Sequence, residues 1–283
     1  MRPRKCSYGA RTDVGCVRDH NEDAYGAWPK KGLFAVTDGM GGHAAGEVAS
    51  EMTIQAVGEV VERYVLADDA DPAAVLQEAL QTANKEVFDR AAREPERANM
   101  GCTAAVIWVM MDKYAIAHVG DSRIYRMRRG RLEALTKDHS YVQELVDRGT
   151  ITPEEAATHS QRNVITRAIG GNSTVETDTS TGDLEPGDTF LLCTDGLCGV
   201  VSEAEAEKRV ASARRLQSLC EALVEDARKA GGPDNVTVAA VRPHFDLSAR
   251  TAHGVERALP FLARLLREAM GMTRRAIQRE SSL

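Results

Sequence analysis

The strand-like and helix-like segments of this chain come in groups instead of alternating one by one. Apolar runs typical of strands stand at residues 33–37, 103–110, 114–119, 123–127, 189–194 and 235–241. Apolar residues recur at helical spacing over 48–61, 75–87, 141–148 and from 202 to about 230. A doubly wound parallel sheet would need strict alternation, so the grouping predicts an α+β sandwich with β-sheets between helical layers.

Two short motifs predict where helices begin. Thr152 with Glu155, and Ser202 with Glu205, have the spacing of a capping box, in which the two side chains bond each other's backbone amides. Pro153 follows Thr152 at the first helical position, where a proline is well tolerated. We therefore expect helices to start at residues 153 and 203.

The length of 283 residues allows one large domain and an appendage. We expect a domain at residues 1–242 and a tail at 243–283. Residues 255–277 place Leu, Phe and Met among Arg at helical spacing, which predicts a basic amphipathic helix. This tail packs on the domain or stays solvated; docking to a partner or a membrane surface is the alternative.

Composition excludes several classes of protein. A net charge of -6 gives no basic surface for nucleic acid. Residues 1–10 lack the apolar core of a signal peptide, and no run approaches the roughly 18 apolar residues of a membrane-spanning helix. We therefore expect a cytoplasmic protein without a transmembrane segment. The six cysteines show no C-x-x-C or zinc-ligand spacing and are predicted to be reduced core residues.

Four aspartates share one feature: each stands at a strand end beside Gly or Asn. They are Asp38, Asp121, Asp195 and Asp234. Any one of them alone is more simply a turn residue. Four strand ends together indicate a common rim, where converging carboxylates repel one another unless hard divalent cations such as Mg²⁺ or Mn²⁺ neutralise them.

The segment at residues 18–23 adds phosphate chemistry to this acidic set. Its sequence is R-D-H-N-E-D, so it brings Glu22 and Asp23 together with Arg18. A guanidinium can bind two phosphate oxygens at once. The combination indicates a site that handles both metal ions and a phosphate group.

These motifs resemble those of one family, the metal-dependent protein phosphatases of type 2C (PPM), and in particular its compact bacterial members. The motifs stand in the family's order over about residues 8–242. They are R-x-x-N-E-D from Arg18, D-G-M-G-G-H-x-x-G from Asp38, G-x-T from Gly101, G-D-S-R from Gly120, N-V-I-T-R-A-I-G from Asn163, D-G-L from Asp195 and D-N-V from Asp234. The resemblance implies the fold as a four-layer α/β/β/α sandwich with two central antiparallel β-sheets flanked by helices.

The resemblance also implies a role for each residue of the site. Asp38 bridges two metal ions, Gly39 contributes its carbonyl, and Asp195 and Asp234 complete the ligands of one ion. The ions are two Mn²⁺ or Mg²⁺ per active site, with Asp121 and Asp195 able to bind a third. Glu22 and Asp23 lie on a metal or one layer outside it, and Arg18 holds the substrate phosphate.

The implied activity is that of a protein serine/threonine phosphatase acting on phosphoserine and phosphothreonine proteins. A water between two metals attacks phosphorus in line, and no covalent enzyme intermediate is needed. No cysteine has the C-x₅-R spacing of cysteine phosphatases, which agrees with this route. We expect the enzyme to oppose a bacterial Ser/Thr protein kinase and to be a monomer.

The proton donor to the leaving group is less clear than the metal ligands. His43 can protonate the leaving oxygen or assist substrate binding, and its alternative is a residue at a helix start. Eukaryotic relatives carry a histidine after the Asp-Gly pair, where this chain has Met40. The isolated histidines His118, His139 and His159 are expected to serve packing or to lie on the surface.

A segment at about 145–168 corresponds to the flap beside the family's active site and is expected to select protein substrates, with Arg162 as a contact. Two other functions compete with the phosphatase. A pseudophosphatase would bind phosphoproteins without catalysis, but the retained Asp38 and Arg18 argue against it. A metal-dependent phosphodiesterase or nuclease would need a basic surface that this chain lacks.

Overall fold

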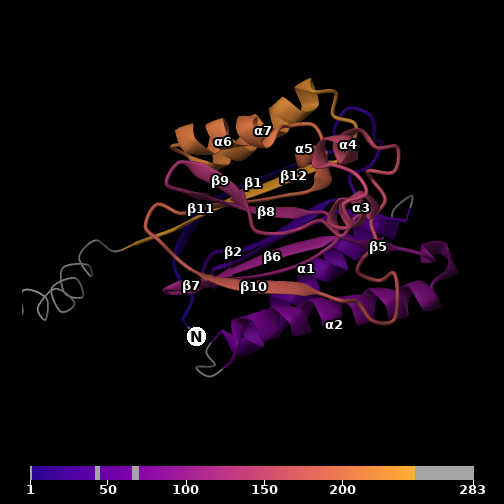
Figure 1. Cartoon of the computed structure of the whole chain (residues 1–283). Coiled ribbons are helices and arrows are strands. Elements are labelled where there is room, and N and C mark those ends of the chain that lie inside the picture. Colours follow the sequence, from indigo (N-terminus) through magenta and orange to yellow (C-terminus); the bar gives the residue numbers. More distant parts are fainter. Residues whose placement is uncertain (1, 42–44, 66–69, 246–283) are drawn as a thin grey trace, which may run out of the picture. The chain divides into compact units, whose positions relative to one another are not determined.

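Two five-stranded antiparallel sheets lie face to face between two pairs of helices in the computed structural model, which describes residues 2–41, 45–65 and 70–245 (Figure 1). The first sheet contains, in order, β1 (Cys6–Asp13), β12 (Val236–Pro243), β11 (Thr189–Cys193), β8 (Arg123–Arg128) and β9 (Arg131–Ala134). The second contains β10 (Asp178–Asp183), β7 (Lys113–Val119), β6 (Ala104–Val109), β3 (Leu33–Thr37) and β2 (Ala24–Trp28). A short pair, β4 (Gly39–Met40) with β5 (Gly101–Cys102), stands apart from both.

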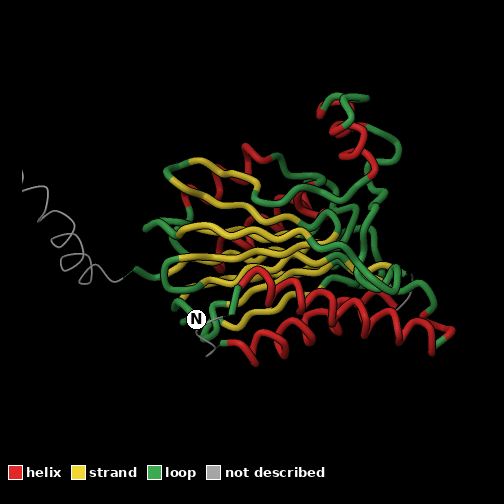
Figure 2. The backbone as a smooth tube through the Cα atoms, turned by 60° about the horizontal axis from the view of Figure 1, so that its bottom comes forward, coloured by secondary structure: helices red, strands yellow, loops and turns green. Residues whose placement is uncertain are grey.

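Each sheet is covered by its own helices. The long α1 (Ala45–Tyr64) and α2 (Pro72–Arg93) pack on the second sheet, and α6 (Glu203–Ser212) and α7 (Leu216–Lys229) on the first. Figure 2 shows the first pair in front of the strands. The α+β fold and its four layers, predicted from the sequence, are confirmed.

The period of two along a strand explains why the central strands are apolar throughout. In β3 all five residues are buried. Leu33 and Ala35 join the core under α1 and α2, whereas Phe34 faces the other sheet and contacts Tyr8 of β1, with ring centroids 5.7 Å apart. One strand thus contributes to two cores, one under the helices and one between the sheets.

The remaining helices are short. They are α3 (Tyr141–Asp147), α4 (Pro153–Thr158), the short α5 (Asp195–Cys198) and a single 3-10 turn, η1 (Pro95–Arg97). Both predicted capping boxes are confirmed at α4 and α6, with the Glu155 N–H donating to Thr152 Oγ1 at 3.2 Å and the Glu205 N–H donating to Ser202 Oγ at 3.3 Å.

Some sequence expectations need correction. The helical stretch from 202 to about 230 is two helices, because the chain leaves helical geometry at the Ala213 cap. Strand β10 (D-T-S-T-G-D) was not predicted, since an exposed edge strand carries no apolar alternation. All six cysteines are free and four are buried, but Cys16 is exposed and Cys198 only half-buried.

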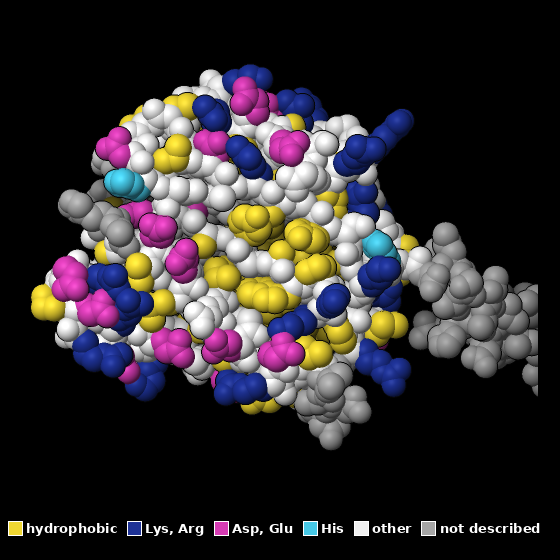
Figure 3. All heavy atoms as spheres, turned by 180° about the vertical axis from the view of Figure 1, so that it is seen from behind, with side chains coloured by type: hydrophobic (Ala, Val, Ile, Leu, Met, Phe, Trp, Pro, Cys, Tyr) yellow, Lys and Arg dark blue, Asp and Glu magenta, His cyan; other side chains and the backbone are white. Residues whose placement is uncertain are grey.

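The residues up to His244 form one compact unit. Apart from its first three residues, the tail predicted at 243–283 lies outside the described part of the chain, and so does the amphipathic helix expected there. Within the described part, no helix is both long and apolar enough to cross a membrane. Figure 3 shows, on the face behind that of Figure 1, apolar side chains surrounded by charged ones.

Candidate active site

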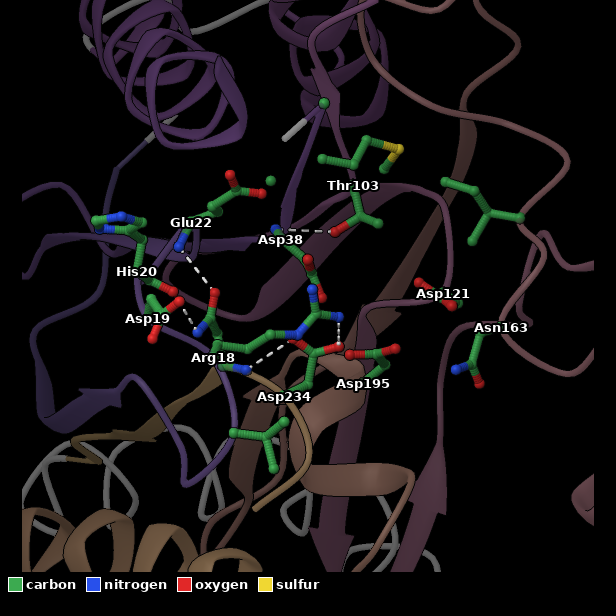
Figure 4. Close-up of a pocket in the computed structure, with 16 residues that line it drawn as sticks. Arg18, Asp19, His20, Glu22, Asp38, Thr103, Asp121, Asn163, Asp195 and Asp234 are labelled. Atoms are coloured by element: carbon green, nitrogen blue, oxygen red, sulfur yellow. Dashed lines mark hydrogen bonds and ion pairs between the residues drawn. The ribbon is translucent and has the colours of Figure 1, made fainter. Parts of the chain in front are cut away.

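One cleft of about 510 Å³ gathers nearly all the residues predicted to bind metal or phosphate. Figure 4 shows the carboxylates of Asp38, Asp195 and Asp234 pointing toward a common space. The predicted residues on its walls are Arg18, Glu22, Asp38, Gly39, Asp121, Asp195 and Asp234. The strand ends explain the convergence: β3 ends before Asp38, β7 before Asp121 and β11 before Asp195, and β12 begins just after Asp234.

Hydrogen bonds among three motifs fix Asp38 at the end of β3. Its backbone N–H donates to Thr103 Oγ1 at 3.1 Å, and the Thr103 N–H donates to the Asp38 carbonyl at 2.8 Å. The Thr103 hydroxyl also lies 2.7 Å from Ser122 Oγ, next to Asp121. A buried threonine therefore ties the Asp-Gly, Gly-x-Thr and Gly-Asp-Ser motifs together.

A close backbone approach places Asp195 beside Asp234. Asp195 is the first residue of α5, and Gly196 follows it. A Cβ at Gly196 would lie 1.9 Å from the Asn235 carbonyl oxygen, so only glycine lets the two segments come this close. The D-G-L and D-N-V motifs meet at this contact, which explains why a glycine follows Asp195.

Asn235 holds the loop that carries Arg18 and Glu22, a role that the sequence analysis did not assign. Its Oδ1 accepts the Glu22 N–H at 2.8 Å, and its Nδ2 donates to the carbonyls of Val14 and His20 at 3.0 and 2.8 Å. Asn235 is buried, so these bonds satisfy both ends of its amide. The D-N-V motif was a signal for this residue, but its partners are 213 or more positions away.

Arg18 reaches into the cleft from that loop. Its Nη2 donates to Asp234 Oδ2 at 2.8 Å, and its side chain is 56% exposed. The guanidinium therefore stands at the cleft mouth beside a predicted metal ligand. Its predicted grip on the substrate phosphate stays a prediction.

The electrostatics of the cleft call for cations. Burial raises the pKa of Asp38 well above its ordinary value, and the nearby carboxylates of Asp23, Asp195 and Asp121 raise it further. Burial and then Asp195 raise the pKa of Asp121 to about 7. Burial likewise raises the pKa of Asp195 and Glu22. Carboxylates forced together in this way are stable in ionised form only beside positive charge.

One oxygen supports a metal in particular. Asp195 Oδ1 is buried and has no hydrogen-bond partner among the described residues. A buried carboxylate oxygen without a partner is costly unless it coordinates something. The set of hard oxygen ligands around it suits Mg²⁺ or Mn²⁺, so the residues present fit the metal centre that the motifs imply.

Asp23 lies behind the cleft instead of on its wall. Its Oδ2 accepts a hydrogen bond from Thr194 Oγ1 at 2.9 Å, and Thr194 directly precedes Asp195. Burial raises the pKa of Asp23 to about 7, against the lowering effect of its threonine hydrogen bonds. Its other oxygen, Oδ1, is buried without a hydrogen-bond partner among the described residues, as Asp195 Oδ1 is, so the place of Asp23 on a metal or one layer outside it stays a prediction.

The predicted proton donor, His43, lies outside the described residues. Met40 lines the cleft where eukaryotic relatives have a histidine. His20 also lines the cleft and was not predicted, although it stands inside the R-x-x-N-E-D motif. The buried His118 and His139 do not line this cleft.

The predicted flap corresponds to α3, α4 and the loop after them. Arg162 lines a second cavity of about 570 Å³ beside these helices. Asp121, Asn163 and Asp195 lie on the walls of both cavities, so the space next to the flap continues the active-site cleft. A polypeptide bound at the cleft could therefore extend along the flap.

Comparisons with known proteins agree with this geometry. Residues 17–236 match the family model described as protein phosphatase 2C. The chain is 41% identical over 238 residues to the serine/threonine protein phosphatase PstP of Mycobacterium tuberculosis, covering 82% of this chain and 44% of that protein. It is 38% identical over 246 residues to the serine/threonine phosphatase stp of Listeria innocua, covering 86% of this chain and 98% of that protein.

Solved structures give the same picture. A crystal structure of the M. tuberculosis phosphatase PstP/Ppp matches with a TM-score of 0.79 at 39% identity, covering 85% of this chain and 99% of that one. The catalytic domain of PstP in complex with two manganese ions matches with a TM-score of 0.75 at 38% identity, covering 83% and 97%. The chain thus spans less than half of full-length PstP but 97% of its crystallised catalytic domain.

Proposed function

Since the chain belongs to the protein phosphatase 2C family, we propose that it is a metal-dependent enzyme that hydrolyses phosphoserine and phosphothreonine in proteins. The observation that carries this proposal is the convergence of Asp38, Asp195 and Asp234 on one cleft, with a buried oxygen of Asp195 left without a protein partner. The relatives named above are serine/threonine phosphatases, which is the activity that the motifs imply.

Asp38, Asp195 and Asp234, with the carbonyl of Gly39, would hold two divalent cations in this cleft. Manganese is the metal in the PstP complex, and Mn²⁺ or Mg²⁺ suits the same oxygen ligands here. When bound, such cations polarise phosphoryl oxygens and lower the pKa of a coordinated water. A third cation at Asp121 and Asp195 belongs to the same proposal.

The side chains of this chain position the substrate around that centre. Arg18 stands at the mouth, where its fork can hold phosphate oxygens while Asp234 orients the guanidinium. Asn235 keeps the Arg18 loop in place through bonds to two of its carbonyls. Arg162 and the cavity beside the flap would receive the polypeptide around the phosphorylated residue.

The biological setting is a further part of the proposal. The substrates would be phosphoproteins that include a Ser/Thr protein kinase, because the sequence resembles phosphatases that oppose such kinases. The cytoplasmic location, the monomeric state and the independence of domain and tail also stay predictions. Nothing in the described cleft favours a pseudophosphatase, since the predicted ligands that line it are retained.

A substrate comparison tests the proposal. We expect the protein with Mn²⁺ to hydrolyse a phosphothreonine peptide far faster than a phosphodiester, and EDTA to abolish this activity. Asp195→Asn should reduce turnover by about 100-fold or more, because metal-site residues have effects of this order or larger. Asp226→Asn, which breaks an ion pair with Arg209 on the far helices, is the control. Phosphodiester turnover above peptide turnover, or peptide turnover in EDTA, would contradict the proposal.

A further inference from the structure

A buried histidine lies between the base of the flap and the turn at Gly120 and Asp121, which is called the Asp121 corner below. It lines no part of the cleft. His139 is 7% exposed and directly precedes Ser140, the N-cap of α3. It is not one of the residues assigned to the metal centre or to the substrate. Its contacts on both sides are nevertheless specific.

On one side, His139 holds both peptide groups of Gly120. The His139 backbone N–H donates to the Gly120 carbonyl at 2.9 Å, and the Gly120 N–H donates to His139 Nδ1 at 3.1 Å. Gly120 has a φ of +95° and packs against Thr103, where a Cβ would lie 2.6 Å from Thr103 Cγ2. The residue after Gly120 is Asp121, so His139 fixes the corner from which that carboxylate projects.

On the other side, the two ends of the flap meet at His139. Its carbonyl accepts the Thr166 N–H at 2.8 Å. The next pairs along are a bridge between Ser140 and Ile165 and the Tyr141 N–H donating to the Val164 carbonyl at 2.8 Å. The flap therefore closes its base on the same residue that holds Gly120.

The bond from Gly120 also fixes which ring nitrogen carries the proton. Because Nδ1 accepts, the proton of a neutral ring is on Nε2, which faces Asp178 Oδ2 at 3.4 Å. Burial lowers the pKa of His139, and the nearby rings and charges of His118 and Arg167 lower it further. A lower pKa favours the neutral ring, which is the form in which Nδ1 can accept the Gly120 hydrogen bond.

A metal site is the competing explanation for these groups. His118, His139 and Asp178 place possible ligand atoms within 4.8 Å of one another. However, Nδ1 of His139 is engaged by Gly120, and Nη1 of Arg167 donates to Asp178 Oδ1 at 2.8 Å while lying 3.1 Å from His139 Nε2. The guanidinium already supplies the positive charge, so the cluster is complete without a metal.

We propose that His139 is a positioning residue that joins the base of the flap to Asp121, so that the flap and the Asp121 carboxylate move as one. The proposal rests on the proposed function in taking Asp121 as a ligand of a third cation. Its consequence is that a polypeptide seated against the flap stabilises the geometry in which Asp121 binds that cation.

Two substitutions separate the two sides of the ring. His139→Asn keeps an acceptor near the place of Nδ1 and gives up the contact with Asp178, whereas His139→Gln keeps a polar group near Nε2 and loses the acceptor for Gly120. His118→Gln is the matched control, because His118 stacks on His139 at 4.5 Å but, among the described residues, its ring bonds the Lys137 carbonyl through Nε2 and not Gly120.

The experiment measures, for each full-length variant, the Mn²⁺ dependence of p-nitrophenyl phosphate and phosphothreonine-peptide hydrolysis, together with the hydrogen exchange of the Gly120 and Thr166 amides. We expect His139→Gln to raise the Mn²⁺ concentration for half-maximal activity by about 10-fold, the usual scale for residues that orient a metal ligand. Both amides should exchange faster. His139→Asn and His118→Gln should stay within about 3-fold of the wild type, well below that scale.

Several results would overturn the inference. If His139→Gln and His118→Gln raise the half-maximal Mn²⁺ concentration equally, His139 acts through packing alone. If His139→Gln and His139→Asn raise it equally, the hydrogen bond to Nδ1 does not position Asp121. Tight Zn²⁺ binding that is lost in both His139→Gln and His118→Gln would favour a metal site. If the wild type shows no Mn²⁺-dependent turnover, the proposed function fails, and the amide exchange rates still decide whether His139 joins flap and corner.

Discussion

The carboxylates of the cleft are held in positions that they would not take without compensation. Burial raises the pKa of Asp38 and of Asp195, and repulsion from neighbouring carboxylates raises both further. A site arranged in this way is destabilised when its carboxylates are ionised and no cation is present. The free-energy cost of holding these ionised carboxylates together is relieved when a cation binds, and this relief contributes to metal affinity.

This cost predicts an unusual pH dependence for the metal-free protein. The pKa of Asp23 and of Asp121 is raised to about 7. A carboxyl whose pKa is higher in the folded state contributes stability that is fully present below its unfolded pKa, about 4, and is lost as the pH rises through the folded value. In EDTA, the urea midpoint of the wild type should decrease as the pH is raised from 5 to 8, and it should decrease more than the midpoint of Asp121→Asn. Mn²⁺ should make this decrease smaller. A rise relative to Asp121→Asn would contradict the account.

At the level of single residues, the sequence could predict which carboxylates line the cleft but not which residues hold them in place. Asp38, Asp121, Asp195 and Asp234 stood out because each follows or precedes a strand beside Gly or Asn. The supporting roles of Asn235 and His139 depend on partners that only folding brings near. No spacing rule in a single sequence reports such contacts.

At the level of elements, the closest approach in the site is between α5 and the start of β12. Gly196→Ala would put a Cβ 1.9 Å from the Asn235 carbonyl oxygen. This oxygen belongs to the backbone, so it cannot give way as a flexible side chain would. We expect the free energy of unfolding to fall by about 1–3 kcal/mol, as at other overpacked sites. Mn²⁺ binding should also weaken, because the added methyl group pushes α5 away and Asp195 moves with it. Urea unfolding and Mn²⁺ titration measure the two effects.

Gly171→Ala is the matched control for that substitution. Its Cβ would meet Ala168 atoms at 3.6 Å or more, an ordinary contact. If Gly196→Ala and Gly171→Ala are equally stable and bind Mn²⁺ equally, the close approach of α5 and β12 does not position Asp195.

Elements differed in how well the sequence predicted them. Strand β3 was predicted residue for residue, because a strand buried on both faces is a continuous apolar run. Strand β10 has the sequence D-T-S-T-G-D and pairs only with β7, so its existence depends on a neighbour instead of on its own pattern. The break between α6 and α7 was also missed, because no proline or glycine stands between the two helices in the sequence.

At the level of the whole molecule, the sandwich brings strand ends from two sheets to one cleft. Asp38 and Asp121 follow strands of the second sheet, while Asp195 and Asp234 adjoin strands of the first. Tyr114 and Phe190 pack across the interface between the sheets, with ring centroids 4.9 Å apart. The proposed metal centre therefore depends on the two sheets staying together.

Both sheets and all the cleft residues lie before residue 246, which predicts the effect of truncation. Deleting residues 246–283 should leave the urea midpoint and the turnover of a phosphothreonine peptide unchanged within error. Pull-down and fractionation of the same deletion test whether the tail docks to a partner or a membrane surface. A large fall in turnover or in the midpoint would show that the tail is part of the catalytic unit.

The central claim is that Asp38 and its neighbouring carboxylates exist to hold divalent cations for phosphate hydrolysis. Its most direct test is the thermal midpoint of the wild type and of Asp38→Asn, each in EDTA and in Mn²⁺, with peptide turnover measured on the same samples. We predict that Mn²⁺ raises the midpoint of the wild type and supports turnover. Asp38→Asn, relieved of a repelled carboxylate, should be at least as stable in EDTA, gain little from Mn²⁺ and lose turnover by about 100-fold or more. A variant that keeps the Mn²⁺-induced rise in midpoint together with full turnover would contradict the claim.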